Sequence, residues 1–223
     1  MLGGPRAHPY SLVLVLIVAT IGLIGIAPDH GWPQVVLVAL EGSTLVAALY
    51  ASKAGTRRIE VASALVIVLV AAALIALLAG QLEVAASHAV GALLAGVAPI
   101  AIGRGAGRKL RSERRITLDT VFGVLCIYLL IGLTFAFVYG AVDRIGGQNI
   151  LTGGDQGSDY LFFSYTTLCT VGYGNLIPAT SVGETLAIFE MLFGQIYLVT
   201  IVSLIVGNLG RARPAAPGGE PTP

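Results

Sequence analysis

The stretch Thr170-Val171-Gly172-Tyr173-Gly174 reads TVGYG and predicts a specialised backbone. Its glycines permit conformations that other residues adopt only with strain. Successive carbonyl oxygens can then face a common axis and replace the water around a dehydrated cation. The string lies between two long apolar segments, after an aromatic-rich stretch and before Pro178. This context indicates a cation-coordinating backbone placed at membrane depth.

The composition indicates a membrane protein, since 56% of the residues are hydrophobic, 11% are charged and the mean hydropathy is +0.86. Soluble domains carry about 25% charged residues. A transmembrane helix needs about 20 apolar residues, and a shorter stretch at Tyr160–Cys169 predicts a re-entrant helix that protein must bury. The expected fold is therefore an all-α membrane protein with six transmembrane helices and one re-entrant pore helix. The six predicted spans are Tyr10–Ala27, Pro33–Tyr50, Val61–Ala79, Glu83–Ile102, Ile116–Tyr139 and Val182–Gly207.

The positive charges predict the orientation in the membrane. Of the 13 lysines and arginines, all but Arg144 lie at the N-terminus, in the second-to-third or fourth-to-fifth loop, or in the tail. The positive-inside rule places both termini in the cytoplasm. A cleaved signal peptide is the alternative for the first span, because Arg6 precedes it and Gly25-Ile26-Ala27 resembles a cleavage site. The apolar run is too long for that reading, and Pro28 follows directly.

The spans divide the chain into two membrane units. Residues 1–103 hold four spans in a compact bundle, and residues 116–209 hold the unit around TVGYG. Residues 104–115 form a basic cytoplasmic linker, expected as a helix along the membrane surface, and residues 210–223 are a Pro- and Gly-rich tail expected to be disordered. With no second TVGYG string, four strands around one axis require a homotetramer. We expect neither a soluble regulatory domain nor a nucleic-acid partner.

Residues 116–209 resemble the pore domain of tetrameric potassium channels, with outer helix, pore helix, selectivity filter and inner helix in that order. The resemblance implies K⁺ as the permeant ion, bound at Thr170, Val171, Gly172 and Tyr173, with Gly174 closing the outer mouth. It implies an ion channel and not an enzyme. Ions would then move passively down their electrochemical gradient.

Several residues around the filter depart from the pattern of that family. Asn175 follows the filter where Asp is common, and Thr166 replaces a glutamate found in some members. Phe162 and Phe163 stand where many members carry tryptophan and cannot donate a hydrogen bond. Glu190, in the inner helix, is interpreted either as an anchor hydrogen-bonded to the pore helix near Tyr165 or Thr167, or as a direct contact for permeating ions.

The inner helix carries the expected gate. Gly194 aligns with the hinge glycine of the family, although close helix packing of a small residue explains it equally well. The resemblance to the family implies that Gln195, Leu198, Val202 and Val206 face the aqueous path. The apolar members of this set would form a constriction that gates by dewetting. Lipid-facing or helix-packing surface is the alternative.

The first four spans resemble the sensor unit of voltage-gated cation channels in topology only. The fourth span, Glu83–Ile102, has no Lys or Arg, so we expect no voltage gating. Glu41 and His88 are ionisable exceptions in an apolar bundle. They predict a proton-sensitive pair that modulates the pore, or a static hydrogen bond, or no contact at all. The linker Arg104–Arg115 would couple the units, bind anionic lipid, or only fix topology.

These features favour a homotetrameric, K⁺-selective, multi-pass channel of the bacterial plasma membrane (the inner membrane). We expect that voltage does not gate it. One alternative is a weakly selective cation channel, suggested by the altered surroundings of the filter. Another is a sensor or assembly subunit whose four-helix unit binds lipid or a partner. The sequence leaves the gating stimulus open.

Overall fold

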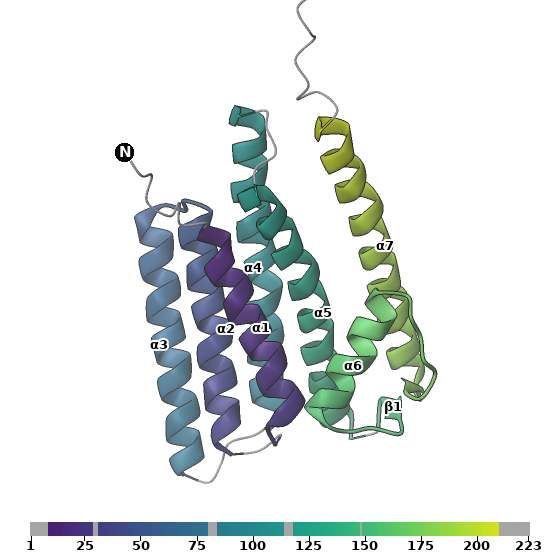
Figure 1. Ribbon diagram of the computed structural model, residues 1–223. Helices are drawn as coiled ribbons and strands as arrows, with labels where there is room; N and C mark the ends of the chain where they lie inside the picture. The colour runs from purple at the N-terminus through teal and green to yellow at the C-terminus, as the bar shows by residue number, and fades with distance from the viewer. Residues whose placement is uncertain (1–8, 29–30, 80–83, 114–117, 148, 210–223) are drawn as a thin grey trace, which may run out of the picture.

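The computed structural model describes residues 9–28, 31–79, 84–113, 118–147 and 149–209. Within these ranges it confirms an all-α membrane protein (Figure 1): six helices are long and apolar enough to cross a bilayer, and the short α6 is the re-entrant helix. The elements are α1 (Pro9–Ile26), α2 (Trp32–Ala51), α3 (Thr56–Leu78), α4 (Val84–Glu113), α5 (Leu118–Gly146), β1 (Leu151–Thr152), α6 (Gly157–Leu168), β2 (Ile177–Pro178) and α7 (Ser181–Leu209).

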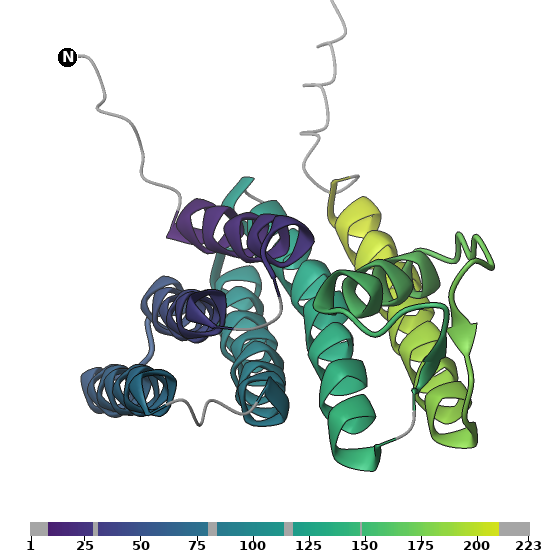
Figure 2. The same ribbon diagram turned by 90° about the horizontal axis from the view of Figure 1, so that it is seen from below.

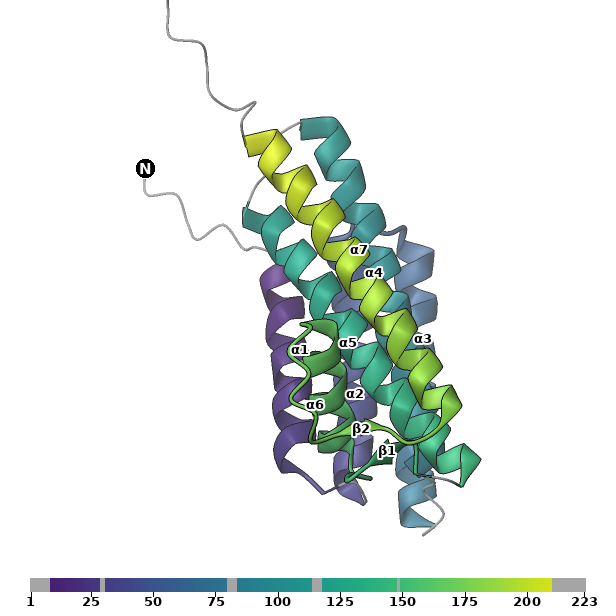
Figure 3. The ribbon, with the colours of Figure 1, turned by 90° about the vertical axis from the view of Figure 1, so that its right-hand side faces the viewer.

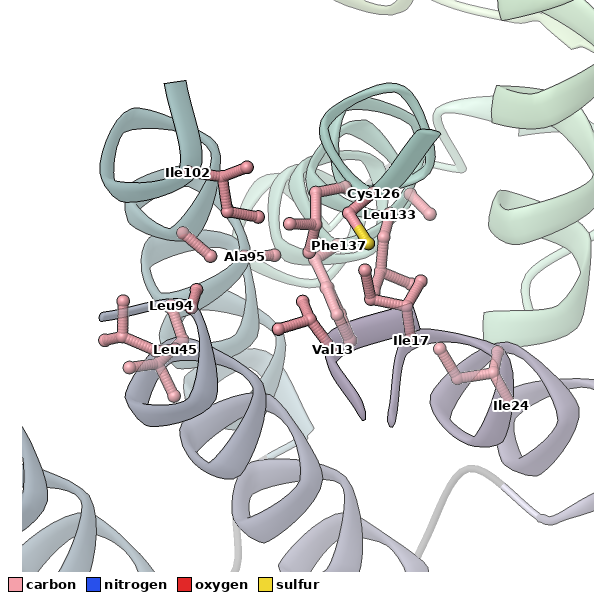
Figure 4. Close-up of a cluster of buried hydrophobic side chains, with 14 of the residues drawn as sticks. Val13, Ile17, Ile24, Leu45, Leu94, Ala95, Ile102, Cys126, Leu133 and Phe137 are labelled. Carbon is pink, nitrogen blue, oxygen red and sulfur yellow. The ribbon is translucent and has the colours of Figure 1, made fainter. Parts of the chain in front are cut away.

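The largest hydrophobic core joins the N-terminal helices to α5 (Figure 4). Val13 and Ile17 of α1, Leu94 of α4 and Leu133 of α5 are all at most 2% exposed in it. Gly91 lets α4 approach α5 closely, because a Cβ there would lie 3.0 Å from the Phe137 ring. The outer helix of the pore unit is therefore part of the same packed body as α1, α2 and α4.

The four helices of the N-terminal unit pack unequally against the rest of the protein. Helix α3 packs against α2 and buries none of its own residues. Figure 2 shows α3 at the edge of the molecule, on the side away from α7. A helix that is apolar on all sides needs no protein cover in lipid, which explains how α3 keeps this position.

Two helices extend beyond their predicted ends. Helix α4 continues without a break to Glu113, so the described part of the basic linker is helical and continuous with the fourth span. No proline follows Pro99 in this segment to stop the helix. Helix α5 continues to Gly146 into the predicted outer loop. The predicted tail over 210–223 lies outside the described residues.

Helices α5, α6 and α7 form the pore unit (Figure 3). The chain between them is held by a two-stranded antiparallel sheet in which Leu151 pairs with Pro178. The Ala179 amide also donates to the Ile150 carbonyl at 2.8 Å. Strands of two residues leave no periodic pattern in a sequence, which is why this sheet was not predicted. It fixes the loop that returns the chain from the filter to α7.

Candidate functional site

Along the predicted filter, the sign of the backbone angle φ alternates from one TVGYG residue to the next. Thr170, Gly172 and Gly174 have φ of 57°, 54° and 78°, while no positive φ occurs at Val171 or Tyr173. Positive φ is unusual for a β-branched residue such as Thr170 and marks a strained position. The alternation explains why glycine occupies every second place after the threonine.

Hydrogen bonds fix which way the first carbonyls of the filter face. The amides of Val171 and Gly172 both donate to the Thr166 carbonyl of α6, at 2.8 and 3.2 Å. All described peptide bonds are trans, and in a trans peptide the N–H and the preceding C=O point in opposite directions. The Thr170 and Val171 carbonyls therefore point away from the end of the pore helix. All residues from Thr170 to Asn175 are exposed in the single chain.

The residues that depart from the family pattern have defined roles in packing. Tyr173 stacks on Phe162, with ring centroids 5.6 Å apart and planes at 18°. Phe163 is buried and meets Tyr139 of α5 edge-on at 5.1 Å. The Thr166 hydroxyl donates to the Phe163 carbonyl at 3.0 Å, and Asn175 is exposed. Ring stacking thus replaces the hydrogen bond that a tryptophan would donate behind the filter.

Glu190 is fully buried and joins the three helices of the pore unit. Its carboxyl group accepts hydrogen bonds from Ser164 of α6 at 2.5 Å and from Tyr139 of α5 at 2.8 Å. The Ser164 hydroxyl also lies 2.7 Å from the Gly132 carbonyl. These partners differ from the Tyr165 and Thr167 side chains considered from the sequence, because the Glu190 side chain reaches the pore helix one residue earlier.

Sequence reasoning missed Tyr139 and Ser164. Tyr139 ends a predicted apolar span, where an aromatic residue is read as an interface anchor. Ser164 lies within an aromatic stretch, and a small hydroxyl residue there forms no recognisable motif. The one available signal was the buried charge of Glu190, since a buried carboxyl group requires donors nearby.

Helix α7 turns a narrow stripe toward α5 and α6, made of Gly183, Ala187, Glu190 and Gly194. At Gly194 a Cβ would lie 2.7 Å from Leu168 Cδ1 and 3.1 Å from the Leu168 carbonyl oxygen. This contact is direct support for the packing explanation of that glycine. Of the predicted pore-lining residues, Gln195 is exposed and Leu198 half-buried, whereas the side chains of Val202 and Val206 lie outside the described part.

Glu41 and His88 are not brought together. Both are buried, but neither carboxylate oxygen of Glu41 has a hydrogen-bond partner among the described residues. The Ser87 hydroxyl donates to Gln34 Oε1 at 2.6 Å, which sets α2 against α4. Glu41 follows Gln34 by two helical turns, about 10 Å deeper. Of the three interpretations of Glu41 and His88, the described contacts therefore favour the one without a hydrogen bond between them. Helix α4 begins much closer to His88 than α2 does to Glu41.

The charged groups outside the pore unit are only partly described. Arg104 belongs to α4, while the side chains of residues 106–113 and all of residues 114–117 lie outside the described part.

Within the pore unit, the Asp159 carboxylate accepts a hydrogen bond from the Gln156 amide at 3.1 Å and so caps the start of α6. Asp159 is thereby engaged at the start of the pore helix, where its charge also suits the helix dipole.

Comparison with known proteins identifies this pore unit. Residues 123–210 match a family described as "Ion channel". Two pore potassium channel a of Oryza sativa subsp. japonica is 32% identical over 102 residues, which are 46% of this chain and 28% of the relative. Inward rectifier potassium channel Kirbac3.1 of Paramagnetospirillum magnetotacticum is 34% identical over 87 residues, 38% of this chain and 28% of the relative. Protein LctB of Bacillus caldotenax is 30% identical over 107 residues, 44% of this chain and 78% of the relative. No solved structure gives a significant match.

The chain belongs to the potassium-channel pore-domain family, whose members are ion channels and not enzymes. It covers only 28% of the length of the first two relatives. The match to the ion-channel family begins at Gly123 in α5, so the shared region is the pore unit. With six helices long and apolar enough to span a bilayer, the protein is a multi-pass membrane protein.

Proposed function

We propose that this protein is a homotetrameric, K⁺-selective channel that conducts K⁺ passively. The observation that carries the proposal is the filter backbone, where φ is positive at Thr170, Gly172 and Gly174 and the first carbonyls turn away from the pore helix. Rings of backbone carbonyls are how such filters replace the hydration shell of the ion. Thr170, Val171, Gly172 and Tyr173 would hold the permeant K⁺, with Gly174 at the outer mouth.

The surfaces that a single chain leaves uncovered support the proposed tetramer. The filter is exposed, with Val171 at 52% and Tyr173 at 71% exposure. Helix α7 exposes apolar side chains such as Phe193 and Ile196 beside its buried stripe. One chain supplies one filter strand, and a closed ring of carbonyls needs several. Four copies around an axis would cover these surfaces with each other, with lipid and with the aqueous path.

The proposed placement is a bacterial inner membrane with both termini in the cytoplasm, as the positive-inside rule indicates. The gate would lie on α7, along Gln195, Leu198, Val202 and Val206, with Gly194 as a packing or hinge position. Glu190, Phe162, Phe163, Thr166 and Asn175 would support the filter. Basic residues of Arg104–Arg115 would face anionic lipid headgroups.

The test is a bi-ionic recording of purified protein in a planar bilayer, with K⁺ on one side and Na⁺ on the other. A reversal potential far toward the K⁺ equilibrium value is expected. Native mass spectrometry in detergent should give four chains per particle. A reversal potential near zero would replace selective K⁺ conduction by the weakly selective alternative, in which the stacked Phe162–Tyr173 pair does not hold the filter in a selective geometry.

A sensor or assembly subunit remains the alternative from another class. Its four-helix unit would bind lipid or a partner while the pore stays closed. The purified protein distinguishes it, because a subunit of this kind should show no K⁺ flux until its ligand is supplied.

A further inference from the structure

His88 lies where the N-terminal helices meet the pore helix. Its side chain is buried, with 5% exposure. The imidazole meets Phe137 of α5 edge-on at 6.0 Å and Tyr160 of α6 edge-on at 6.4 Å between ring centroids. Gly140 of α5 makes room for it, because a Cβ there would overlap the imidazole. The His88 imidazole thus connects α4 directly to both α5 and α6 of the pore unit.

A small cavity opens beside the same imidazole. Its volume is about 10 Å³, close to the space that one water molecule needs. Helices α1, α2, α4 and α5 and the first residue of α6 line it, together with Pro28 from the loop after α1. Gln34 and His88 are its polar side chains. A water molecule held there would have hydrogen-bonding partners and would lie near the outer ends of the helices.

The pore helix responds to whatever moves Tyr160. The Tyr160 side chain is fully buried in the second core of the molecule, together with Phe163, Ile150 and Leu151. Its hydroxyl donates to the Asp155 carbonyl at 3.2 Å and also interacts with the Asp143 carboxylate. This one side chain therefore joins the start of α6 to α5 and to the outer loop that precedes the filter.

We propose that His88 is a binding site for an external proton, and that it transmits its charge state through Tyr160 to the pore helix. The proposal rests on the proposed K⁺ conduction. A neutral imidazole packs well between aromatic rings, whereas an imidazolium requires water or an opposite charge. On protonation the ring should turn toward the water-sized cavity and leave Tyr160. External acid should therefore lower K⁺ flux.

Among the described residues, the ionisable groups around this contact are few. On α5 they are Asp143, which accepts the Ile150 amide at 2.5 Å, and Arg144, whose charge acts on Tyr160. The outer loop contributes Asp155, and α6 contributes Tyr160 and the capping residue Asp159. On α2 the acidic group is Glu41, about two turns deeper. The described part of α1 carries no acid or base near its outer end.

The experiment is K⁺ current in patches of giant liposomes, with pH stepped from 8 to 5 on one side at a time. Acid on the side of the filter mouth should lower the current by at least roughly two- to tenfold, the effect of losing this aromatic contact in a single subunit. Acid on the other side should do nothing through this site. The response should vanish in His88→Gln and persist in His30→Gln, a histidine outside the described residues that is the matched control.

Three results would overturn the proposal: a current unchanged by external acid, a response that survives in His88→Gln, or one that disappears in His30→Gln. NMR of ¹³C-labelled histidine and tyrosine in the wild-type tetramer gives a test that does not need conduction, with the two signals assigned by comparison with His88→Gln and Tyr160→Phe. The His88 imidazole should titrate between pH 8 and 5, and the Tyr160 signal should shift with it. A His88 that stays neutral over this range also overturns the proposal, whereas absence of K⁺ current at pH 8 contradicts only the proposed conduction.

Discussion

At the scale of single residues, the filter depends on backbone conformations that its own side chains resist. Thr170 adopts φ of 57° although it is β-branched, at a cost of about 1–3 kcal/mol. The two bonds to the Thr166 carbonyl and the packing of Tyr173 on Phe162 offset that cost. The motif predicted this backbone, because only glycine adopts positive φ freely. It could not show that Thr166 supplies the acceptor, since carbonyl groups carry no sequence signal.

Substitution of Gly172 tests the backbone directly. Its φ is 54° and nothing in its own subunit lies within 4 Å of the position that a Cβ would take, so an L-alanine there suffers strain and not a clash. Gly172→Ala should lose about 1–2 kcal/mol per subunit and abolish selective K⁺ current. D-alanine introduced by semisynthesis should restore the current, because the mirror-image residue prefers positive φ. Equal loss with both alanines would contradict the conformational argument.

Substitutions of Glu190 distinguish its two possible roles, an anchor for the pore helix and a direct contact for permeating ions. Glu190→Leu leaves the buried Tyr139 hydroxyl without an acceptor, whereas Ser164 can still donate to the Gly132 carbonyl. We expect a loss of about 1–3 kcal/mol in tetramer stability, measured by thermal unfolding in detergent. Glu190→Gln keeps shape and hydrogen bonds and should retain both stability and conductance. A large fall in single-channel conductance for the Gln variant would instead indicate direct contact with ions.

At the scale of elements, helix existence could be predicted but helix neighbours could not. Apolar runs of sufficient length predicted all six spans, since lipid demands that length from any crossing helix. Depth and pairing depend on where each helix begins. Because α2 starts at Trp32 and α4 at Val84, Gln34 meets Ser87 and Glu41 lies too deep for His88. A small shift of helix ends thus changed the proposed pair while leaving the fold intact.

Helix α2 therefore carries an unsatisfied carboxyl group, and removing it should stabilise the protein. Glu41 is 1% exposed and both its oxygens lack partners among the described residues. Glu41→Leu should raise the free energy of unfolding by about 1–3 kcal/mol, seen as a higher melting temperature of the tetramer. Thr44→Val is the control on the same helix, because the Thr44 hydroxyl already donates to the Leu40 carbonyl at 2.8 Å. A lower melting temperature for Glu41→Leu would show that the carboxyl group has a stabilising partner in the tetramer.

At the scale of the whole molecule, the N-terminal helices form one body with the pore unit but carry almost no charge between Arg58 and Arg104. The core that joins α1, α2 and α4 to α5 would transmit any movement of these helices to the outer helix. The sequence has no Lys or Arg between Arg58 and Arg104, which leaves the third span and the membrane part of α4 without positive charge. The N-terminal helices thus pack directly against the outer helix of the pore unit, but the stretch between Arg58 and Arg104 carries no positive charge that a membrane voltage could move.

Voltage should therefore have little effect on opening. Each elementary charge that crosses the membrane field contributes about 2.3 kcal/mol per 100 mV, or roughly a 50-fold change in the ratio of open to closed channels. With no basic residue between Arg58 and Arg104, the open probability of purified tetramers should change far less than this between −100 and +100 mV, a range set by the usual scale of membrane potentials, about 100 mV. Glu41 is the acidic residue that could carry charge within the field, so Glu41→Gln is the matched variant. A steep voltage dependence that Glu41→Gln abolishes would assign the charge to α2, and one that persists would contradict a non-sensing N-terminal unit.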